Sequence, residues 1–464
     1  MVLEDPQRPE IDAELAWFTR HPDYLERVAR RARPFLHLIV TRLRERGMPL
    51  DLALLPVVES GFEPYAYSPG RAAGIWQFIP STGRHFGLRQ NWWYDGRRDI
   101  VASTGAALDY LGRLYRRFGD WELAIAAYNC GARTVERAIE KNHRAGRPTG
   151  FWSLDLPAET RSYLPRLLAV RRAFQAPERF GLNLPELPDE PLLEEVDARG
   201  QIDLARAAEM AGLEMEAFYR LNPAYNRWAT PPDGPHRFLL PKANADRFRT
   251  ALAGLPEEER VVWRRHLIRE GETLSHIARR HHLTVAALMR VNHLRDHRIR
   301  AGRYLLIPSA SRPLTEYSQS VEARRQRRLN ASGKGEKHIV TVRPGDTLWD
   351  LARAHGVSLR RLSAWNGIAP RDTLHPGQKL VLWKEAPASG SAPEKVAETL
   401  RPTRRTIRYR VRAGDSLWEI ASRFSVSVSE LCRWNGIPRN QILQPGQHLR
   451  LFVDVTEQSG SGRG

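Results

Sequence analysis

One carboxylate is placed where it could act as a general acid. Glu59 follows the apolar run 52–58 and precedes Ser60 and Gly61, a glycine that can terminate a helix. Burial disfavours the charged form of a carboxyl group, and the negative end of a helix dipole acts in the same direction. Both effects predict that Glu59 stays protonated near neutral pH, as a general acid requires. The alternative is a glutamate that is simply exposed at a helix end.

Three further motifs follow Glu59 in a fixed order. They are a Gly-x-x-Gln motif that ends at Gln77, an Ala-Tyr-Asn motif that ends at Asn129, and a segment from Glu159 to Tyr163. With the Glu-Ser pair, this order resembles the lytic transglycosylases with a goose-lysozyme-like (SLT) catalytic domain, and in particular the membrane-bound type D enzymes. One such motif alone would be weak, but the ordered set is specific. The resemblance covers residues 20–175 and, with the repeats described below, most of the chain.

The resemblance implies a role for each motif residue. Glu59 matches the catalytic acid, and Ser68 matches a serine that polarises the N-acetyl group or a hydroxyl of the sugar. Gln77 would line the subsite beside the scissile bond, and Tyr128 would lie near the catalytic carboxyl group. The remaining expected substrate-binding residues are Asn129, Glu159 and Tyr163. For each of them the alternative is a packing or capping role.

The resemblance also implies a mechanism with one essential carboxylate, whereas most glycosidases use two. Glu59 would protonate the oxygen between N-acetylmuramic acid and N-acetylglucosamine in peptidoglycan. It would then take the proton of the C6 hydroxyl, which closes onto C1 and leaves a 1,6-anhydromuramoyl end. One alternative is a hydrolase of the same fold, for which Asp95 or Asp99 would be the second carboxylate. Another is a cell-wall-binding protein without activity. Glu63, next to Pro64, is expected to be exposed.

The elements that must position these residues are predicted to be helices. Apolar residues follow the helix period from Ile100 to Phe118, Gly119-Asp120 ends that helix and caps the next, and Gly131 ends the helix at 121–130. The sequence shows neither βαβ alternation nor a glycine-rich phosphate loop. We therefore expect a mainly α, lysozyme-like catalytic domain at 31–180, preceded by a helical segment at 1–30.

The second half of the chain contains three copies of one pattern. Each copy has an acidic-hydroxyl turn after a glycine, an aliphatic-Ala pair, an asparagine 21 residues after that glycine, and a closing apolar run. Each predicts a βααβ unit whose first helix is capped by the turn. The copies resemble LysM, the module that binds N-acetylglucosamine polymers. The residues that the resemblance implies for glycan binding, with capping as the alternative, are Glu272, Thr273, Asn292, Asp346, Thr347, Asn366, Asp415, Ser416 and Asn435.

The predicted layout is multidomain, with small α+β modules on flexible linkers after the catalytic domain. LysM modules are expected at 263–309, 337–384 and 406–453. Polar or Ala-Pro-Ser-rich stretches at 310–336 and 385–405 are interpreted as linkers, and 454–464 as a disordered tail. The region 181–262 is interpreted as a further linker with a degenerate LysM-like unit at 195–245, which lacks the Gly-Asp-Thr turn. Tethered modules would raise avidity for the glycan.

The strongly basic composition calls for an anionic partner or environment. The formal charge is +19 and the pI is near 10.4. No base-reading module is recognised, so we expect peptidoglycan glycan strands as the partner and no nucleic acid. Arginines such as Arg27, Arg30, Arg31 and Arg33 are interpreted as solvated helix faces.

The sequence also bears on compartment and cofactors. No apolar run is long enough to span a membrane, and the start at Met1 has no secretory signal, so the chain is expected either to be cytoplasmic or to lack its export segment. The family resemblance implies the periplasm or cell envelope, with peripheral outer-membrane association. Two cysteines, Cys130 and Cys432, exclude a disulfide framework. We expect a monomer with no cofactor and no metal.

Overall fold

The computed structural model describes most of the chain. It covers residues 2–384 apart from 282 and 334, and beyond them residues 404–411, 415, 417, 420, 428–438, 441, 443–444 and 446–454. The chain divides into two compact units, Met1–Glu385 and Ala386–Gly464. The predicted linker at 385–405 and tail at 454–464 lie almost wholly outside the described residues.

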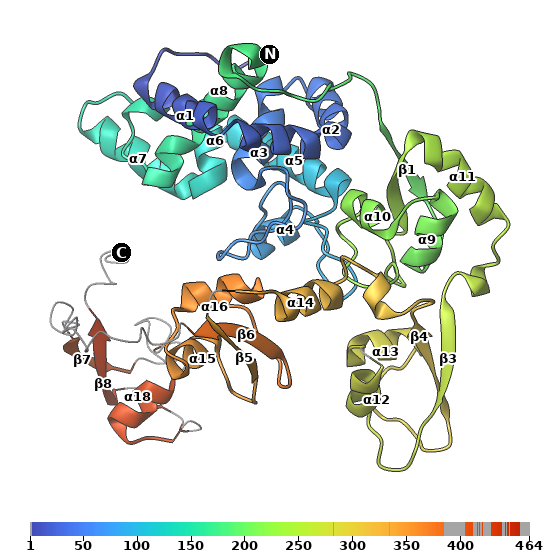
Figure 1. The fold of residues 1–464 in the computed structure, drawn as a ribbon. Coiled ribbons are helices and arrows are strands. Elements are labelled where there is room, and N and C mark those ends of the chain that lie inside the picture. Colours follow the sequence, from blue (N-terminus) through green and yellow to red (C-terminus); the bar gives the residue numbers. More distant parts are fainter. Residues whose placement is uncertain are drawn as a thin grey trace. The chain divides into compact units, whose positions relative to one another are not determined.

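The first 180 residues form a helical domain (Figure 1). Its helices are α1 (Pro9–Arg20), α2 (Pro22–Glu45), α3 (Leu55–Ser60), α4 (Pro80–His85), α5 (Ile100–Phe118), α6 (Trp121–Cys130), α7 (Ala132–Arg144) and α8 (Ala158–Gln175), with short 3-10 turns η1 (Leu50–Leu54), η2 (Phe151–Ser153) and η3 (Pro177–Phe180). The predicted mainly α domain is confirmed.

Side-chain caps and glycines set the limits of the central helices. Asp99 accepts a hydrogen bond from the Ala102 N–H at 2.7 Å and begins α5, which ends at Gly119 with a φ of +68°. Asp120 accepts from the Leu123 N–H at 2.9 Å and begins α6. These caps therefore confirm the helices that the sequence predicts here.

The core of the helical domain gathers around α8. This helix packs against α1, α3 and α6, and its buried residues include Leu164, Leu167, Leu168 and Val170. Because its apolar residues occupy more than one face, α8 is covered on several sides, as a central helix must be. It can therefore hold a side chain against the end of α3.

A smaller module follows the helical domain, and we call it the leading module. It consists of β1 (Leu193–Asp197), α9 (Leu204–Ala211), α10 (Met215–Leu221), β2 (Arg237–Pro241) and the added helix α11 (Lys242–Ala253), followed by η4 (Glu257–Glu259). β1 and β2 pair antiparallel, with Val196 opposite Phe238. The segment that was expected to carry a degenerate unit thus has the βααβ order.

The leading module shares its core with the helical domain. Trp93 and Tyr94 of the helical domain belong to the buried cluster of the module. The Asp95 N–H donates to the Ala224 carbonyl at 2.9 Å, and the Asn226 N–H donates to the Trp93 carbonyl at 2.8 Å. The module is therefore packed against the helical domain through side chains and backbone.

Three repeat modules have the predicted βααβ order where they are described. The first has β3 (Val262–Leu267), α12 (Leu274–Arg280), α13 (Val285–Val291) and β4 (Tyr304–Ser309). The second has β5 (Glu336–Thr341), α15 (Leu348–Ala354), α16 (Leu359–Asn366) and β6 (Lys379–Lys384), and the third has β7 (Arg404–Arg410), α18 (Val428–Asn435) and β8 (His448–Asp454). Each strand pair is antiparallel, which confirms the predicted α+β modules.

The segment 310–336 differs from its expected form as a flexible tether. It contains η5 (Leu314–Glu316) and α14 (Val321–Asn330), whose N-cap is Ser320. Tyr317 is buried, and its hydroxyl donates to the Asp203 carboxylate of the leading module at 2.8 Å. The Arg-rich composition of this segment concealed the buried tyrosine that holds it in place.

Candidate active site

Glu59 lies in the last turn of α3, and this helix is shorter than the sequence suggests. The apolar run divides into η1 and the six-residue α3, with Pro56 in the first turn, where proline is tolerated. Gly61 ends α3 with a φ of +58°, and its N–H is bonded to the carbonyl of Val57. The turn leaves Glu59 half-buried beside α8.

The environment of Glu59 keeps its carboxyl group partly protonated at neutral pH. Burial raises the pKa of Glu59 to about 7, against 4.5 for an ordinary glutamate; a hydrogen bond from Tyr163 lowers it, and the charge of Glu159 raises it. The Tyr163 hydroxyl donates to Glu59 Oε1 at 2.5 Å. A pKa near neutrality suits a group that must first give and then take a proton.

Tyr128 forms the neighbouring wall of the site. Its hydroxyl donates to the Trp76 carbonyl at 2.9 Å, and Trp76 is itself buried, with its indole N–H on the Thr104 hydroxyl at 3.0 Å. Burial, followed by the charge of Glu59, raises the pKa of Tyr128. Tyr128 therefore stays neutral and ties the end of α6 to the motif loop 67–79, close enough to feel the charge of Glu59.

The motif loop is folded by hydrogen bonds of its own. Ser68 Oγ accepts from the Ala72 N–H at 3.0 Å, and Gln77 donates its amide to the Gly74 carbonyl at 2.7 Å. Gln77 has a φ of +47°, a conformation that L residues adopt rarely. Ser68 and Gln77 thus help to shape the loop.

Two residues fix this loop below the site. Gly74 has a φ of +80°, and a Cβ there would lie 2.0 Å from the Arg97 carbonyl oxygen, so no other residue fits. The Arg97 guanidinium donates to the carbonyls of Arg71 and Phe78 at 2.7 and 3.2 Å.

Asn129 and Glu159 lie at the ends of the two helices beside Tyr163. Asn129 Oδ1 accepts from the buried Thr160 hydroxyl at 2.7 Å, which links the end of α6 to the start of α8. Glu159 is exposed one helical turn before Tyr163 and acts on Glu59 through its charge. Glu59, Tyr128, Glu159 and Tyr163 are thus brought together.

The other nearby carboxylates are occupied by structural contacts. Asp95 is buried and pairs with Arg97 at 2.7 Å. Burial would raise its pKa, but the Arg97 hydrogen bonds and the charges of Arg98 and Arg97 outweigh this and lower the pKa. Asp99 caps α5 and accepts from the Tyr94 hydroxyl. Glu63 is partly exposed and pairs with Arg31 at 3.4 Å.

The asparagines predicted to bind glycan in the repeat modules share one structural contact. In each module the Asn side-chain amide donates to the carbonyl four residues earlier and to the carbonyl of one residue on the closing strand. The Asn side-chain oxygen accepts from the N–H of that same strand residue. The pairs are Asn292 with Leu306, Asn366 with Val381, and Asn435 with Arg450. Asn222 does the same with Leu239 in the leading module. We call this contact the asparagine clamp.

The turn residues of the modules also hold local structure. Thr273 and Thr347 cap α12 and α15, and Asp346 accepts from the Arg343 N–H at 2.7 Å. The Arg269 N–H and the His266 ring lower the pKa of Glu272 to about 2. Asp415 accepts from the Tyr409 hydroxyl at 2.6 Å, and Ser416 lies outside the described residues. A role of these turns in glycan binding stays a prediction.

Several residues that position the site were missed from the sequence. Ser60 Oγ donates to the Ile75 carbonyl at 3.0 Å and ties α3 to the motif loop. Its place directly after Glu59 was a signal that could have found it. Thr104 and Thr160 lie in helices, and no local pattern in the sequence marks them as part of the site.

Among the described residues, no cluster of three His, Cys, Asp or Glu side chains could hold a metal ion, and no helix is long and apolar enough to cross a membrane.

Comparisons with known proteins match the helical domain, the leading module and the repeat modules. The model of the transglycosylase SLT domain family matches residues 39–149. The LysM-like domain of lytic transglycosylase MltD matches 192–257, and the LysM domain matches 266–308, 340–383 and 409–452. The helical domain with its half-buried glutamate is therefore that of an SLT lytic transglycosylase, an enzyme that acts on peptidoglycan.

Similarity over the whole chain defines the family. Membrane-bound lytic murein transglycosylase D of Escherichia coli (strain K12) is 35% identical over 97% of this chain and 82% of that protein. The chain belongs to this family, as its resemblance predicted. Two other relatives match 42% of this chain. An autolysin of Enterococcus faecalis is 31% identical over a stretch that covers 25% of that protein. The N-acetylmuramoyl-L-alanine amidase sle1 of Staphylococcus aureus (strain MRSA252) is 28% identical over a stretch that covers 55% of that protein.

Proposed function

We propose that Glu59 alone serves as acid and then as base in cutting the bond between N-acetylmuramic acid and N-acetylglucosamine. The observation that carries the proposal is the raised pKa of Glu59, about 7, together with the Tyr163 hydroxyl on its carboxyl group. Such a group is partly protonated at neutral pH, so it can give a proton to the leaving oxygen and take one back from the attacking hydroxyl.

In the proposed reaction atoms balance without water. The Glu59 proton moves to the glycosidic oxygen as the C1–O bond breaks, and the sugar passes through an oxocarbenium-like state. The C6 hydroxyl then forms a bond to C1, and its proton returns to the Glu59 carboxylate. The products are a 1,6-anhydromuramoyl end and a free C4 hydroxyl on the leaving sugar.

The surrounding side chains suit binding and orientation rather than proton transfer. Tyr128 and Tyr163 stay neutral because burial raises the pKa of each, and both can orient the Glu59 carboxyl group. We propose that Ser68, Gln77, Asn129 and Glu159 line the sugar subsites, since they stand on the loop and helix ends around that group.

A hydrolase of the same fold is the second candidate. It would need another carboxylate to activate water. Asp95 is held by Arg97, and Asp99 is used as a helix cap, so neither is available for this task. This favours attack by the C6 hydroxyl of the substrate.

The remaining parts of the proposal concern place and organisation. We propose that the enzyme works in the cell envelope as a monomer with peripheral outer-membrane association, in line with the name of its membrane-bound Escherichia coli relative. The LysM modules hold it on peptidoglycan, with glycan contacts at the turns and clamps named above. We propose that the catalytic domain spans 31–180 and that the LysM modules span 263–309, 337–384 and 406–453.

The test is mass spectrometry of products released from purified sacculi. The full chain should release fragments with anhydro ends, each one water lighter than a reducing end. Glu59→Gln should release none while still sedimenting with sacculi. Glu10→Gln, which removes an exposed carboxylate from α1, is the matched control and should act like the wild type. Reducing ends as the main product, or an active Glu59→Gln, would overturn the mechanism.

A further inference from the structure

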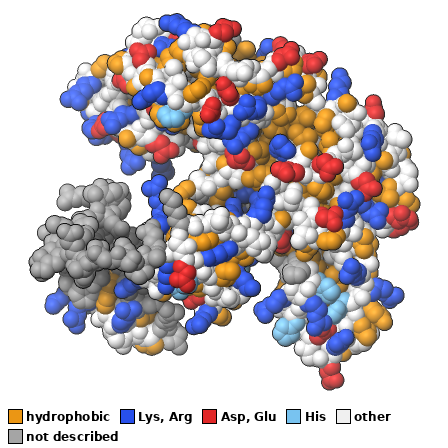
Figure 2. All heavy atoms as spheres, viewed as in Figure 1, with side chains coloured by type: hydrophobic (Ala, Val, Ile, Leu, Met, Phe, Trp, Pro, Cys, Tyr) orange, Lys and Arg blue, Asp and Glu red, His pale blue; other side chains and the backbone are white. Residues whose placement is uncertain are grey.

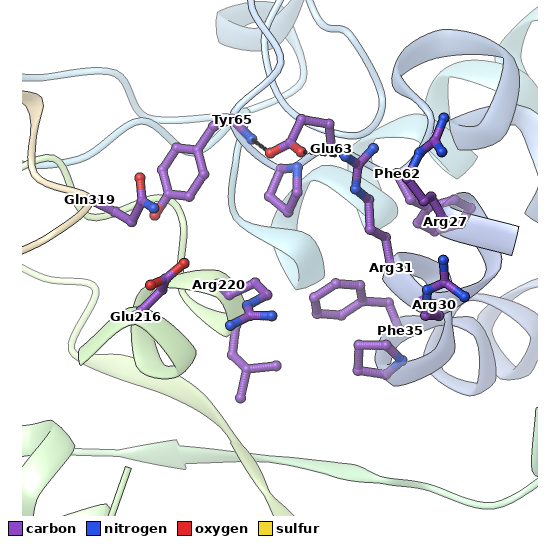
Figure 3. A pocket seen from close by; sticks show the side chains of 13 residues that line it. Arg27, Arg30, Arg31, Phe35, Phe62, Glu63, Tyr65, Glu216, Arg220 and Gln319 are labelled. Atoms are coloured by element: carbon purple, nitrogen blue, oxygen red, sulfur yellow. Dashed lines mark hydrogen bonds and ion pairs between the residues drawn. The ribbon is translucent and has the colours of Figure 1, made fainter. Parts of the chain in front are cut away.

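The segment that follows Glu59 lines a cavity of about 540 Å³. Its walls come from α2, from residues 62–65, from α10 and from Gln319 (Figure 3). The helical domain and the leading module are joined beside it by the Tyr65 hydroxyl, which donates to the Tyr219 carbonyl at 3.0 Å. The cavity is therefore a feature of the packed pair.

Most charged residues of the cavity form no ion pair within the described part of the chain. Four arginines and two glutamates line it, an excess of two positive charges. Arg31 pairs with Glu63 and also donates to the Gly61 carbonyl at 3.3 Å. The other four, which are Arg27, Arg30, Arg220 and Glu216, have no ion pair or side-chain hydrogen bond within the described part of the chain. Figure 3 shows the α2 arginines on one side and Arg220 with Glu216 on the other.

The three α2 arginines are exposed, as expected of a solvated helix face, and they crowd like charge at the rim of the cavity. Arg27, Arg30 and Arg31 have the spacing that puts side chains on one side of a helix, where like charges destabilise each other. Beside them, Phe35 and Phe62 are buried and form an apolar floor. Cations around an apolar floor fit a ligand that carries carboxylates on an apolar body.

The place of the cavity indicates which carboxylates these are. Glu63 lies four residues after Glu59, so the Cα atoms of the two are at most about 14 Å apart. The peptide that hangs from N-acetylmuramic acid spans a similar distance when four of its residues are extended, roughly 13–14 Å. A sugar at Glu59 can thus carry a peptide that reaches this cavity.

We propose that the cavity binds the acidic stem peptide of peptidoglycan, an inference that rests on the proposed function for its substrate. Arg27, Arg30 and Arg220 take the carboxylates, and Glu216 takes the amine of the diamino acid. The stem has more carboxylates than amines, which matches the excess positive charge of the walls. The enzyme therefore distinguishes glycan that bears peptides from glycan that has lost them.

The test is calorimetric titration of the full-length Glu59→Gln protein with a free tetrapeptide of L-Ala, γ-linked D-Glu, the diamino acid and D-Ala. Binding is expected, and it should weaken as salt is added because the contacts are ionic. Arg27→Glu with Arg30→Glu should weaken it at least tenfold, and Arg220→Ala, on the opposite wall, should also weaken it. The control is Arg116→Glu on α5, a single charge reversal of the same kind at an exposed position outside the cavity.

Two outcomes would overturn the inference: no binding of the tetrapeptide, or equal binding by the Arg220→Ala protein and its parent. Circular dichroism of each variant separates loss of the site from loss of the fold, and Arg220→Ala is the mild variant should the double charge reversal unfold. No bond is cut in this titration. Failure of the proposed function would instead appear as absent anhydro ends, with peptide binding unaffected.

Discussion

Replacing Tyr163 by Phe removes one hydroxyl that touches the catalytic carboxyl group and leaves the ring. That hydroxyl donates to Glu59 Oε1 at 2.5 Å and lowers the pKa of Glu59. A hydrogen bond to a charged group contributes about 1.5–3 kcal/mol, and one pKa unit corresponds to about 1.4 kcal/mol. Tyr163→Phe should therefore raise the pKa of Glu59 from about 7 by roughly one to two units.

The direction of the effect on activity follows from the role of Glu59 as the acid. Activity falls as pH rises through the pKa of Glu59, because only the protonated form can start the reaction. In Tyr163→Phe this alkaline fall should move to higher pH by the same one to two units. The assay is kcat/KM against pH on soluble peptidoglycan fragments. If the variant is too slow, NMR titration of the labelled Glu59 carboxyl group gives the same pKa.

The control is Tyr115→Phe, which changes a half-buried tyrosine stacked on Trp121. Its pH profile should coincide with that of the wild type. An alkaline fall that stays in place in folded Tyr163→Phe, or moves to lower pH, would refute the reasoning, because the hydroxyl would then not favour the charged carboxylate.

Three further predictions concern stability. The pKa of Glu59 is raised from 4.5 to about 7 in the folded state. Ionising this group therefore does not lower the free energy of unfolding below pH 4.5, and lowers it by up to about 3 kcal/mol above pH 7. Glu59→Gln should thus unfold at a higher temperature than wild type at pH 8 and at nearly the same temperature at pH 4. Gly74→Ala should cost at least about 2–3 kcal/mol in thermal unfolding because its Cβ meets the backbone, whereas Gly87→Ala, with a φ of +77° and open space, should cost only about 1 kcal/mol. Asn366→Ala should cost about 2–3 kcal/mol in urea unfolding of the second repeat module, since it leaves both backbone groups of Val381 unpaired; an unchanged midpoint would show the clamp to be unimportant.

Local signals in the sequence were sufficient for helices α5 and α6 and for the repeat modules. The caps Asp99 and Asp120 and the terminating Gly119 mark α5 and α6 correctly, because caps act within one helical turn. The repeat pattern likewise predicts each βααβ unit, since its turn and closing strand are encoded within about 45 residues. The raised pKa of Glu59 also followed from its apolar neighbours.

Contacts between residues far apart in the sequence could not be predicted from such local patterns. Tyr163 meets Glu59 across 104 residues, and no spacing within α8 indicates this. The apolar run before Glu59 gave no sign that it divides into η1 and α3. The docking of 310–336 through Tyr317 was hidden by the arginines around it. Figure 2 shows Lys and Arg side chains spread over the face that it draws, so charge alone does not single out a site.

The sharing of Trp93 and Tyr94 between two domains has a practical consequence. Both rings are almost fully buried, and the partners that cover them come from the leading module. A protein shortened to its first 180 residues would expose both aromatic side chains to water. It would also lose the backbone bridge between Tyr94 and Tyr225. A shortened protein that keeps both rings covered therefore extends at least to the end of α11, and one that also keeps Tyr317 in the core of the leading module extends beyond it.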